Sequence, residues 1–534
     1  MRFLRALLCA ASLLPLFPAQ PFSAQAAPPN APIFRVNSTL VFLDVTVLDK
    51  NGHPVVHGLT RDDFAITEDK RPQRIFSFEA PETHVMAAGS GDDNPEGKAP
   101  TTILVLDLLN SQFSDFAYIR YSVKKFLDEQ PARLAAPAEM MVVGNEYLEM
   151  IQGYTRSRAD LLYALDHLPA ARPFKRMNAM FFWSRFEQSI DAIQQIALQN
   201  KGVPGRKNVV WVGHGGPSVN LDARVLGPRD VDVLKDYVHD TTNMLVDSRI
   251  SLFVIYPGLK AWGSDLSISA MDADADIGET DPFAGDINFG LLSNATGGQL
   301  FYNRNDLDRL IGRSEELGSE YYTLTYQPDD PDNQADGKFR RIRVTVRDRN
   351  LHVVTKAGYF APDRNESDHS RRHTMDSLIE AAQAVIPFKA LNVQVVNVVR
   401  HTDAGTAEFM VQLNVKNLHW LAGDNGQDRA NLILAAVSLN GDRNIVASRI
   451  VGVTLLPKTL AAPQRQQVET QLPVTVPFPR KARSVRVVME TETGGRIGTA
   501  EVDRKTIDAA PVLPTPNPQL VPHQRPEQVR PSAP

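Results

Sequence analysis

Three alternating aspartates are the first residues in this sequence whose spacing could do chemistry. Asp272, Asp274 and Asp276 place a carboxylate on every second residue, and such spacing is typical of calcium-binding loops. An EF-hand loop beginning at Asp272 would need glycine at its sixth position and glutamate at its twelfth. Ile277 and Phe283 stand there instead. The residues therefore favour a solvated acidic loop over a calcium site.

A glycine-rich turn offers a second possible chemistry, acyl transfer. His214, Gly215 and Gly216 follow an apolar run and resemble the oxyanion turn of an esterase, with Ser218 close by. A serine hydrolase of this kind also needs a Gly-x-Ser-x-Gly nucleophile elbow, and the sequence contains none. The two glycines are better explained by a backbone bend. We therefore expect no enzymatic activity, and an extracytoplasmic hydrolase is the less favoured alternative.

Thiol and zinc chemistry have no residues to support them. The only cysteine is Cys9, which lies in the leader, and the twelve histidines form no paired zinc motif. A mature chain without cysteine can form no disulfide, no thiol nucleophile and no cysteine-ligated metal site.

Residues 1–26 are predicted to be a secretory signal peptide. Two arginines precede an apolar stretch over 6–17, and Ala24-Gln25-Ala26 is a small-x-small cleavage site. The apolar stretch is shorter than the roughly 20 residues that a spanning helix needs. We expect an exported protein, periplasmic or extracellular, that begins at Ala27.

Composition narrows the classes of partner. The 534 residues are too many for one ordinary domain, and 43% hydrophobic with 22% charged residues is a globular composition. A formal net charge of −5 gives no electrostatic signature of nucleic-acid binding. No segment after the leader is apolar enough to span a membrane. These observations leave protein partners as the expected class.

The elements that must position any site change character along the chain. Thr102–Asp107, Val209–Gly213 and Ser251–Tyr256 are continuous apolar runs, as expected of parallel strands buried on both faces. Helical segments alternate with them, which predicts a doubly wound, mostly parallel α/β sheet. Short alternating runs on either side predict β-rich, sandwich-like domains.

The predicted organisation has eight parts. They are the signal peptide (1–26), an N-terminal β-module (34–80), a linker (81–100), the α/β domain (101–327), a β extension of it (328–362), a second linker (363–387), a C-terminal β-sandwich (388–506) and a Pro-rich disordered tail (507–534).

Three groups of residues carry a family resemblance. They are Val41–Lys70 with its Asn51-Gly52 turn, Val105–Ser111, and a third block with Thr296-Gly297-Gly298, Asp306-Leu307, Tyr321-Tyr322, Gly337–Arg341 and Gly358-Tyr359. Over these residues the central region resembles the von Willebrand factor A fold. Residues 34–362 more closely resemble the von Willebrand factor A-related family found largely in Acidobacteria. The resemblance implies a fold and an exported compartment.

The resemblance also implies a cation site. A von Willebrand factor A domain often holds Mg²⁺ or Ca²⁺ through Asp-x-Ser-x-Ser after the first strand, with a later Thr and Asp. Asp107 matches the first position and Ser111 the last, whereas Leu109 replaces the middle serine. Residues 174–177 lack the expected Thr, and His214 stands where the later Asp is common.

Two of five oxygen ligands hold a divalent cation poorly, so Asp107 and Ser111 are also explained by capping of the loop or helix that follows. We expect a cation-independent protein-interaction domain without a cofactor. A cation-dependent adhesin that uses the partial Mg²⁺ or Ca²⁺ site is the alternative. The aromatic run Phe181–Trp183 with Phe186 is expected to pack in the core, with an exposed ligand surface as its alternative.

Overall fold

The computed structural model describes most of the chain from Leu40 onward. The described residues are 40–86, 99–111, 113–144, 147–168, 179–221, 226–257, 281–302, 304–328, 336–361, 378–384, 386–388, 391–401, 405–414, 418, 429–455, 469–491 and 496–513. The predicted signal peptide, the alternating aspartates from Asp272 to Asp276 and the end of the Pro-rich tail lie outside them.

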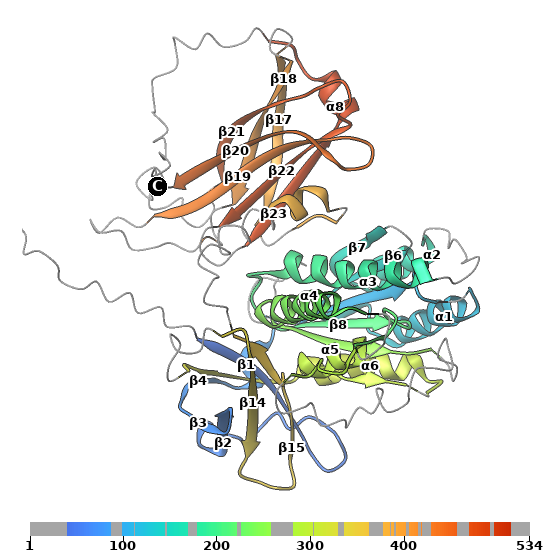
Figure 1. The fold of residues 1–534 in the computed structure, drawn as a ribbon, viewed down its shortest axis with the longest axis vertical. Coiled ribbons are helices and arrows are strands. Elements are labelled where there is room, and N and C mark those ends of the chain that lie inside the picture. The colour runs from blue at the N-terminus through green and yellow to red at the C-terminus, as the bar shows by residue number, and fades with distance from the viewer. Residues whose placement is uncertain are drawn as a thin grey trace, which may run out of the picture. The chain divides into compact units, whose positions relative to one another are not determined.

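A six-stranded sheet forms the centre of the α/β part (Figure 1). Five strands are parallel, and the edge strand β7 pairs antiparallel with β6. Every residue of β5, β8 and β10 is buried, because each is an apolar run covered on both faces. The three predicted central strands are confirmed. The order across the sheet is β12 (Leu300–Phe301), β10 (Ile250–Ile255), β8 (Lys207–Val212), β5 (Thr101–Asp107), β6 (Arg133–Gly144), β7 (Tyr147–Ser157).

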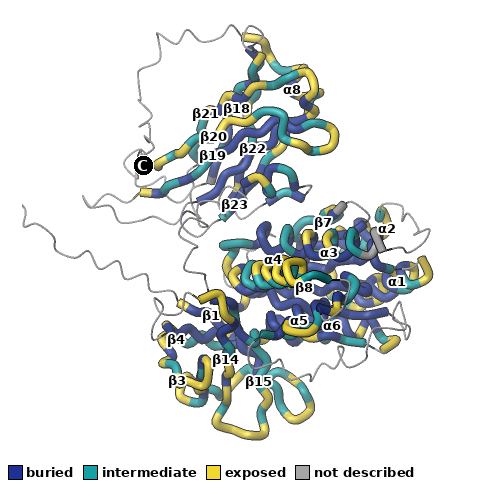
Figure 2. Tube along the Cα trace, in the orientation of Figure 1, coloured by how far each residue is buried: buried dark blue, intermediate teal, exposed yellow. Residues whose placement is uncertain are grey.

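Helices cover both faces of this sheet (Figure 1). Alternate residues of β5 point to opposite faces, so Ile103 and Val105 pack in one core while Leu104 and Leu106 pack in the other. The first core is closed by α3 (Ala179–Asn200), α4 (Pro228–Asp247) and α5 (Phe289–Ala295), the second by α1 (Phe113–Glu129), α2 (Arg158–Asp166) and α6 (Leu307–Ser319). Buried residues lie along the strands and the inner helix faces (Figure 2).

The aromatic run at the start of α3 contributes to the first core. Phe186 is 1% exposed there, and Trp183 packs against it edge-on with ring centroids 6.2 Å apart. The side chains of Phe181 and Phe182 lie outside the described residues. Core packing is therefore the arrangement of the two described aromatics.

Strands from before and after the α/β part form a shared β-module with its own hydrophobic core. Its two four-stranded sheets have the orders β15-β1-β13-β4 and β16-β14-β2-β3. The strands are β1 (Val41–Leu48), β2 (Phe64–Glu68), β3 (Arg71–Gln73), β4 (Ile75–Glu79), β13 (Tyr322–Tyr326), β14 (Phe339–Val346), β15 (His352–Val354) and β16 (Gly358–Phe360), with 3₁₀ turns at Arg61–Asp63 and Pro81–His84. The α/β part is thus inserted between β4 and β13.

This pairing changes the predicted boundaries on both sides of the α/β part. The strand β13, expected within 101–327, pairs with β1 and β4 instead. Its buried tyrosines and leucine complete the core of the β-module rather than the core of the α/β sheet. The N-terminal module and the 328–362 extension are therefore one folded unit in which the chain leaves and returns.

Residues 386–513 form two antiparallel sheets with a common core. The sheets have the orders β17-β18-β21 and β20-β19-β22-β23. Their elements are β17 (Val393–His401), β18 (Thr406–Asn414), β19 (Ala430–Leu439), β20 (Ile445–Leu455), β21 (Glu469–Pro477), β22 (Ser484–Thr491), β23 (Ile497–Asp503) and α8 (Arg504–Ala509), and another helical turn covers 378–383.

The expected disordered tail has described structure at its start, and the expected linker makes specific contacts near its end. Residues 507–513 were assigned to the disordered tail, yet Ile507 is fully buried in α8, and Leu513 donates its N–H to the Arg400 carbonyl at 2.9 Å. Within the expected linker, the carbonyls of Gln383 and Ala384 accept hydrogen bonds from Arg443. These contacts satisfy backbone and guanidinium groups that would otherwise lose their partners.

Candidate functional site

The strand order makes the carboxyl ends of β5 and β8 the expected place for a ligand. Counted along the chain, the six strands run 3-2-1-4-5-6 across the sheet, and the order reverses between β5 and β8. Ligands of open α/β sheets bind outside the carboxyl ends of the strands at such a reversal. Asp107 ends β5, and Gly213 and His214 follow β8. The structure thus brings these sequence-predicted residues to one place.

Asp107 is fully buried and accepts hydrogen bonds from three other residues. One oxygen accepts the Asn110 backbone N–H at 2.8 Å, and the other accepts the Trp211 indole N–H at 3.1 Å and the Gly215 N–H at 2.9 Å. The Asn110 amide adds contacts at 3.3 and 3.2 Å. Burial raises the pKa of the Asp107 carboxyl, and the hydrogen bonds from Asn110 and Trp211 oppose that rise. The carboxylate organises the loops around it.

Two glycines permit this close approach. Gly213 has φ +152°, and a Cβ at that position would lie 2.2 Å from the Asp107 Cβ. Gly215 has φ +66°, and its Cβ would lie 2.8 Å from the Phe289 ring. Left-handed backbone and missing side-chain space both require glycine. The bend expected at Gly215 is therefore present.

A second layer of polar groups comes from α3. The Asn110 amide donates to the Ser189 hydroxyl at 3.0 Å, and the Arg185 guanidinium donates to the Leu109 carbonyl at 2.8 Å. Arg185 is 7% exposed. Burial lowers the pKa of its guanidinium to about 10, against the opposing charge of Asp107. Sequence reasoning missed Asn110, Trp211, Arg185 and Ser189 as members of this site.

Leu109 supplies no side-chain oxygen for a cation, which leaves Ser111 as the second candidate ligand. Leu109 is fully buried in the hydrophobic core. The Ser111 hydroxyl is buried and has no hydrogen-bond partner among the described residues. Both Asp107 oxygens accept N–H groups, and Asp107 and Ser111 together supply only two of the five oxygen ligands of the family pattern. The residues present do not fit a divalent cation.

His214 pairs with an acid at the start of α1. Its Nε2 lies 3.2 Å from the Asp115 carboxylate, and its ring meets Tyr256 edge-on at 5.7 Å. Ser218 makes no hydrogen bond to His214 within the described part of the chain. Across the same residues, no three His, Cys, Asp or Glu side chains converge as a metal-binding group.

An exposed aromatic side chain lies just after the loop 108–111 in the sequence. Phe113 is the first residue of α1, two positions beyond Ser111, and 70% of its surface is exposed. Exposed aromatic side chains next to a structured polar loop are typical anchors of protein interfaces. The hydrogen-bonded loop 108–111 is therefore followed closely by one large exposed apolar side chain.

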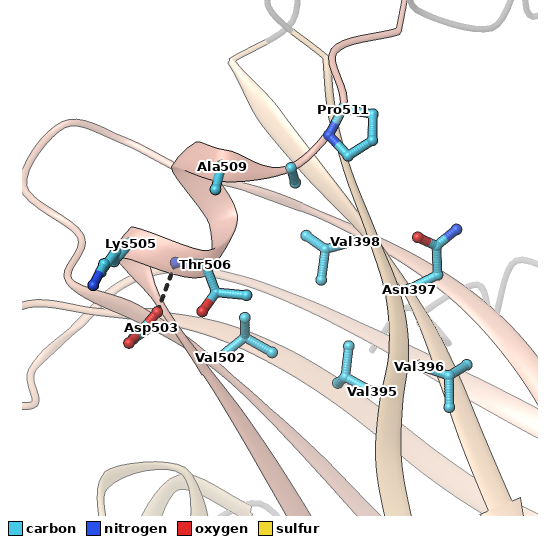
Figure 3. A pocket seen from close by; sticks show the side chains of 11 residues that line it. Val395, Val396, Asn397, Val398, Val502, Asp503, Lys505, Thr506, Ala509 and Pro511 are labelled. Atoms are coloured by element: carbon cyan, nitrogen blue, oxygen red, sulfur yellow. Dashed lines mark hydrogen bonds between the residues drawn. The ribbon is translucent and has the colours of Figure 1, made fainter.

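A concave feature lies between β17 and α8 in the C-terminal part. This groove encloses about 680 Å³. Figure 3 shows Val395 and Val398 of β17 facing Val502 and Thr506 across it. The Asp503 carboxylate on its rim caps α8 by accepting the Thr506 N–H at 2.7 Å. The groove is an apolar seam between two edge strands, and its acid is already used in capping.

Comparisons with known proteins add little to this geometry. No family model and no curated protein matches the chain. The SpRpn10 VWA domain is similar over 29% of this chain and 74% of that one, with 17% identity and a TM-score of 0.20. Proximal thread matrix protein 1 from the mussel byssus is similar over 30% of this chain and 38% of that one, with 9% identity and a TM-score of 0.21. The human COPII-coat protein Sec24c is similar over 54% of this chain and 47% of that one, with 11% identity and a TM-score of 0.24.

These TM-scores are too low to support an argument about the fold. The fold is defined by the strand order and the pairing of the strands. Among the described residues, no helix combines the length and the apolar character needed to cross a bilayer.

Proposed function

We propose that this chain is an exported, von Willebrand factor A-like protein that binds another protein at the cell envelope or outside the cell, without a cation and without catalysis. The C-terminal sheets would form a β-sandwich that accompanies the binding domain. The observation that carries the proposal is the saturated Asp107. At the carboxyl edge of the sheet, where α/β domains bind ligands, this carboxylate accepts N–H groups that fix a loop, which supports a role in positioning a contact surface.

The proposed contact surface is the loop 108–111 with Phe113 at the start of α1. Phe113 offers an exposed apolar surface of the kind that contributes most to interface energy. Export is supported by the basic start, the apolar stretch and the cleavage site before Ala27. N-terminal sequencing of the native protein should therefore read from Ala27, and a native chain beginning at Met1 would contradict the export proposal.

A capture experiment tests the binding proposal. Mature protein is immobilised and exposed to an envelope extract, with Mg²⁺ or with EDTA, and the captured proteins are identified. We expect the same partner in both buffers. Phe113→Ala should reduce its capture at least tenfold, the loss expected for a hot-spot side chain worth about 1.4 kcal/mol or more.

The matched control is Phe76→Ala, because Phe76 on β4 is 68% exposed but lies in the β-module. It should leave capture unchanged. Capture that disappears in EDTA would favour the cation-dependent adhesin, and equal losses for the two variants would place the contact elsewhere.

A further inference from the structure

A buried guanidinium lies beneath the Asp107 loop. Arg185 donates to the Leu109 carbonyl at 2.8 Å, and Ser189, four residues further along α3, accepts from the Asn110 amide at 3.0 Å. Residues four apart lie on the same face of a helix. The helix α3 therefore presents a positive charge and a hydroxyl to the same short loop.

Asp107 and Arg185 carry opposite charges on neighbouring elements of this region. Asp107 is fully buried and Arg185 is 7% exposed, so neither charge is well solvated. The Asp107 charge stabilises the protonated guanidinium against its burial. A divalent cation would add two positive charges beside a guanidinium and a carboxylate whose oxygens already accept N–H groups. The Arg185 guanidinium thus supplies the positive charge that a bound cation would otherwise supply to this loop.

We infer that Arg185 is the resident cation of this site. It is a positioning residue whose fixed charge, together with the donors to Asp107, holds the loop 108–111 and the start of α1 in one conformation without metal. The role of that conformation in presenting Phe113 rests on the proposed function. The charge role of Arg185 stands on the contacts of the described residues alone.

Two substitutions separate the charge of Arg185 from its hydrogen bond. Arg185→Gln keeps a donor for the Leu109 carbonyl and removes the charge, whereas Arg185→Lys keeps the charge. If the charge matters, the thermal midpoint should fall by several degrees in Arg185→Gln and by clearly less in Arg185→Lys. A larger loss for Arg185→Lys would overturn the inference, because it would assign the residue a purely geometric role.

A double-mutant cycle with Asp107→Asn tests the pairing. Removing both charges should cost less than the sum of the two single losses, by about 2 °C or more in the midpoint. Arg206→Gln is the matched control, since Arg206 is 2% exposed but precedes the opposite end of β8, and its loss should add to that of Asp107→Asn. Additive losses for Arg185 and Asp107 would overturn the inference.

Metal addition completes the test and needs no variant. Saturating Mg²⁺ or Ca²⁺ should leave the midpoint of the wild-type protein unchanged within about 1 °C, whereas a bound cation would stabilise the native state; a clear upward shift would overturn the inference. If Arg185→Gln does not fold, this titration and Arg185→Lys still decide. Coupling without partner capture would refute the proposed function alone, and capture without coupling would refute only the role of Arg185.

Discussion

Lys207 gives the sharpest stability prediction, because it is a buried cation whose ammonium forms no ion pair with a carboxylate among the described residues. It is the first residue of β8 and 1% exposed, and its ammonium donates to the carbonyls of Val203 and Gly205. Burial, followed by repulsion from Arg249, lowers the pKa of Lys207 from 10.5 to about 7. We predict that Lys207→Met makes stability less dependent on pH.

The sign follows from proton binding. Between pH 7 and 10.5 the unfolded chain protonates this lysine and the folded chain does not, so native stability rises with pH over that range. At 1.36 kcal/mol per pKa unit, the cost of burying the group is about 5 kcal/mol well below pH 7 and vanishes above about 10.5. Between pH 6.5 and 9 the cost falls by about 2.5 kcal/mol.

The assay is urea unfolding followed by tryptophan fluorescence at pH 6.5, 7.5 and 9. The variant should be more stable than the wild type at pH 6.5, by less than the full cost because the two carbonyls lose a donor at about 1–3 kcal/mol. That advantage should shrink by about 2.5 kcal/mol by pH 9. Other titrating groups cancel in the comparison of the two proteins.

Lys125→Met is the matched control. The Lys125 side chain is 44% exposed and lies 2.6 Å from Asp308, and its hydrogen bond to that carboxylate raises its pKa. It stays charged across the same pH range, so its variant should show a constant offset. A constant offset for Lys207→Met as well, or destabilisation by it at every pH, would refute the reasoning.

Three further predictions concern the site and the tail. Asp107→Ala should destabilise the protein by more than the ~1 kcal/mol of a lost cap, because it strands buried donors on Asn110, Trp211 and Gly215; Asp115→Ala, with a partly exposed carboxylate, should cost clearly less in the same urea assay. Gly213→Ala should cost ~2 kcal/mol or more, because its Cβ would clash with Asp107, whereas Gly285→Ala, which has open space, should be nearly neutral in melting temperature. Deleting residues 514–534 should leave the melting midpoint unchanged, while a deletion from Pro511 should lower it by removing the hydrogen bonds to Arg400; equal midpoints for the two deletions would contradict the role given to Pro511–Leu513.

The central sheet could be predicted from the sequence because each of its central strands contains a continuous apolar run. Ile103–Leu106 and Leu252–Ile255 are continuous apolar runs, a pattern typical of strands covered on both faces. The position of Asp107 at a strand end followed from the same pattern. The surrounding contacts did not, because Trp211 reaches Asp107 from 104 residues away and Arg185 reaches the Leu109 carbonyl from 76 residues away. No local pattern encodes such contacts.

The β-module was divided in the prediction for the same reason. Several of its strands have a local signal, but the pairing of Val41 with Tyr326 joins residues far apart in the chain. Strand β23 and helix α8 were not predicted, because Ile497–Asp503 mixes small and charged residues and α8 is a single short helix. The Asp503 cap was the available signal for α8.

The insertion of the α/β part between β4 and β13 sets the order in which the chain can acquire structure during synthesis. β1 and β4 have no strand partner until β13 exists, since β13 lies between them in the sheet. At about 5–20 residues per second, the residues from Ala80 to Tyr321 take about 12 to 50 seconds to be made. Throughout that interval β1 and β4 are unpaired strand segments of a nascent chain, the kind of segment that aggregates. The N-terminal strands must therefore stay protected until the chain beyond Tyr326 arrives to close the β-module.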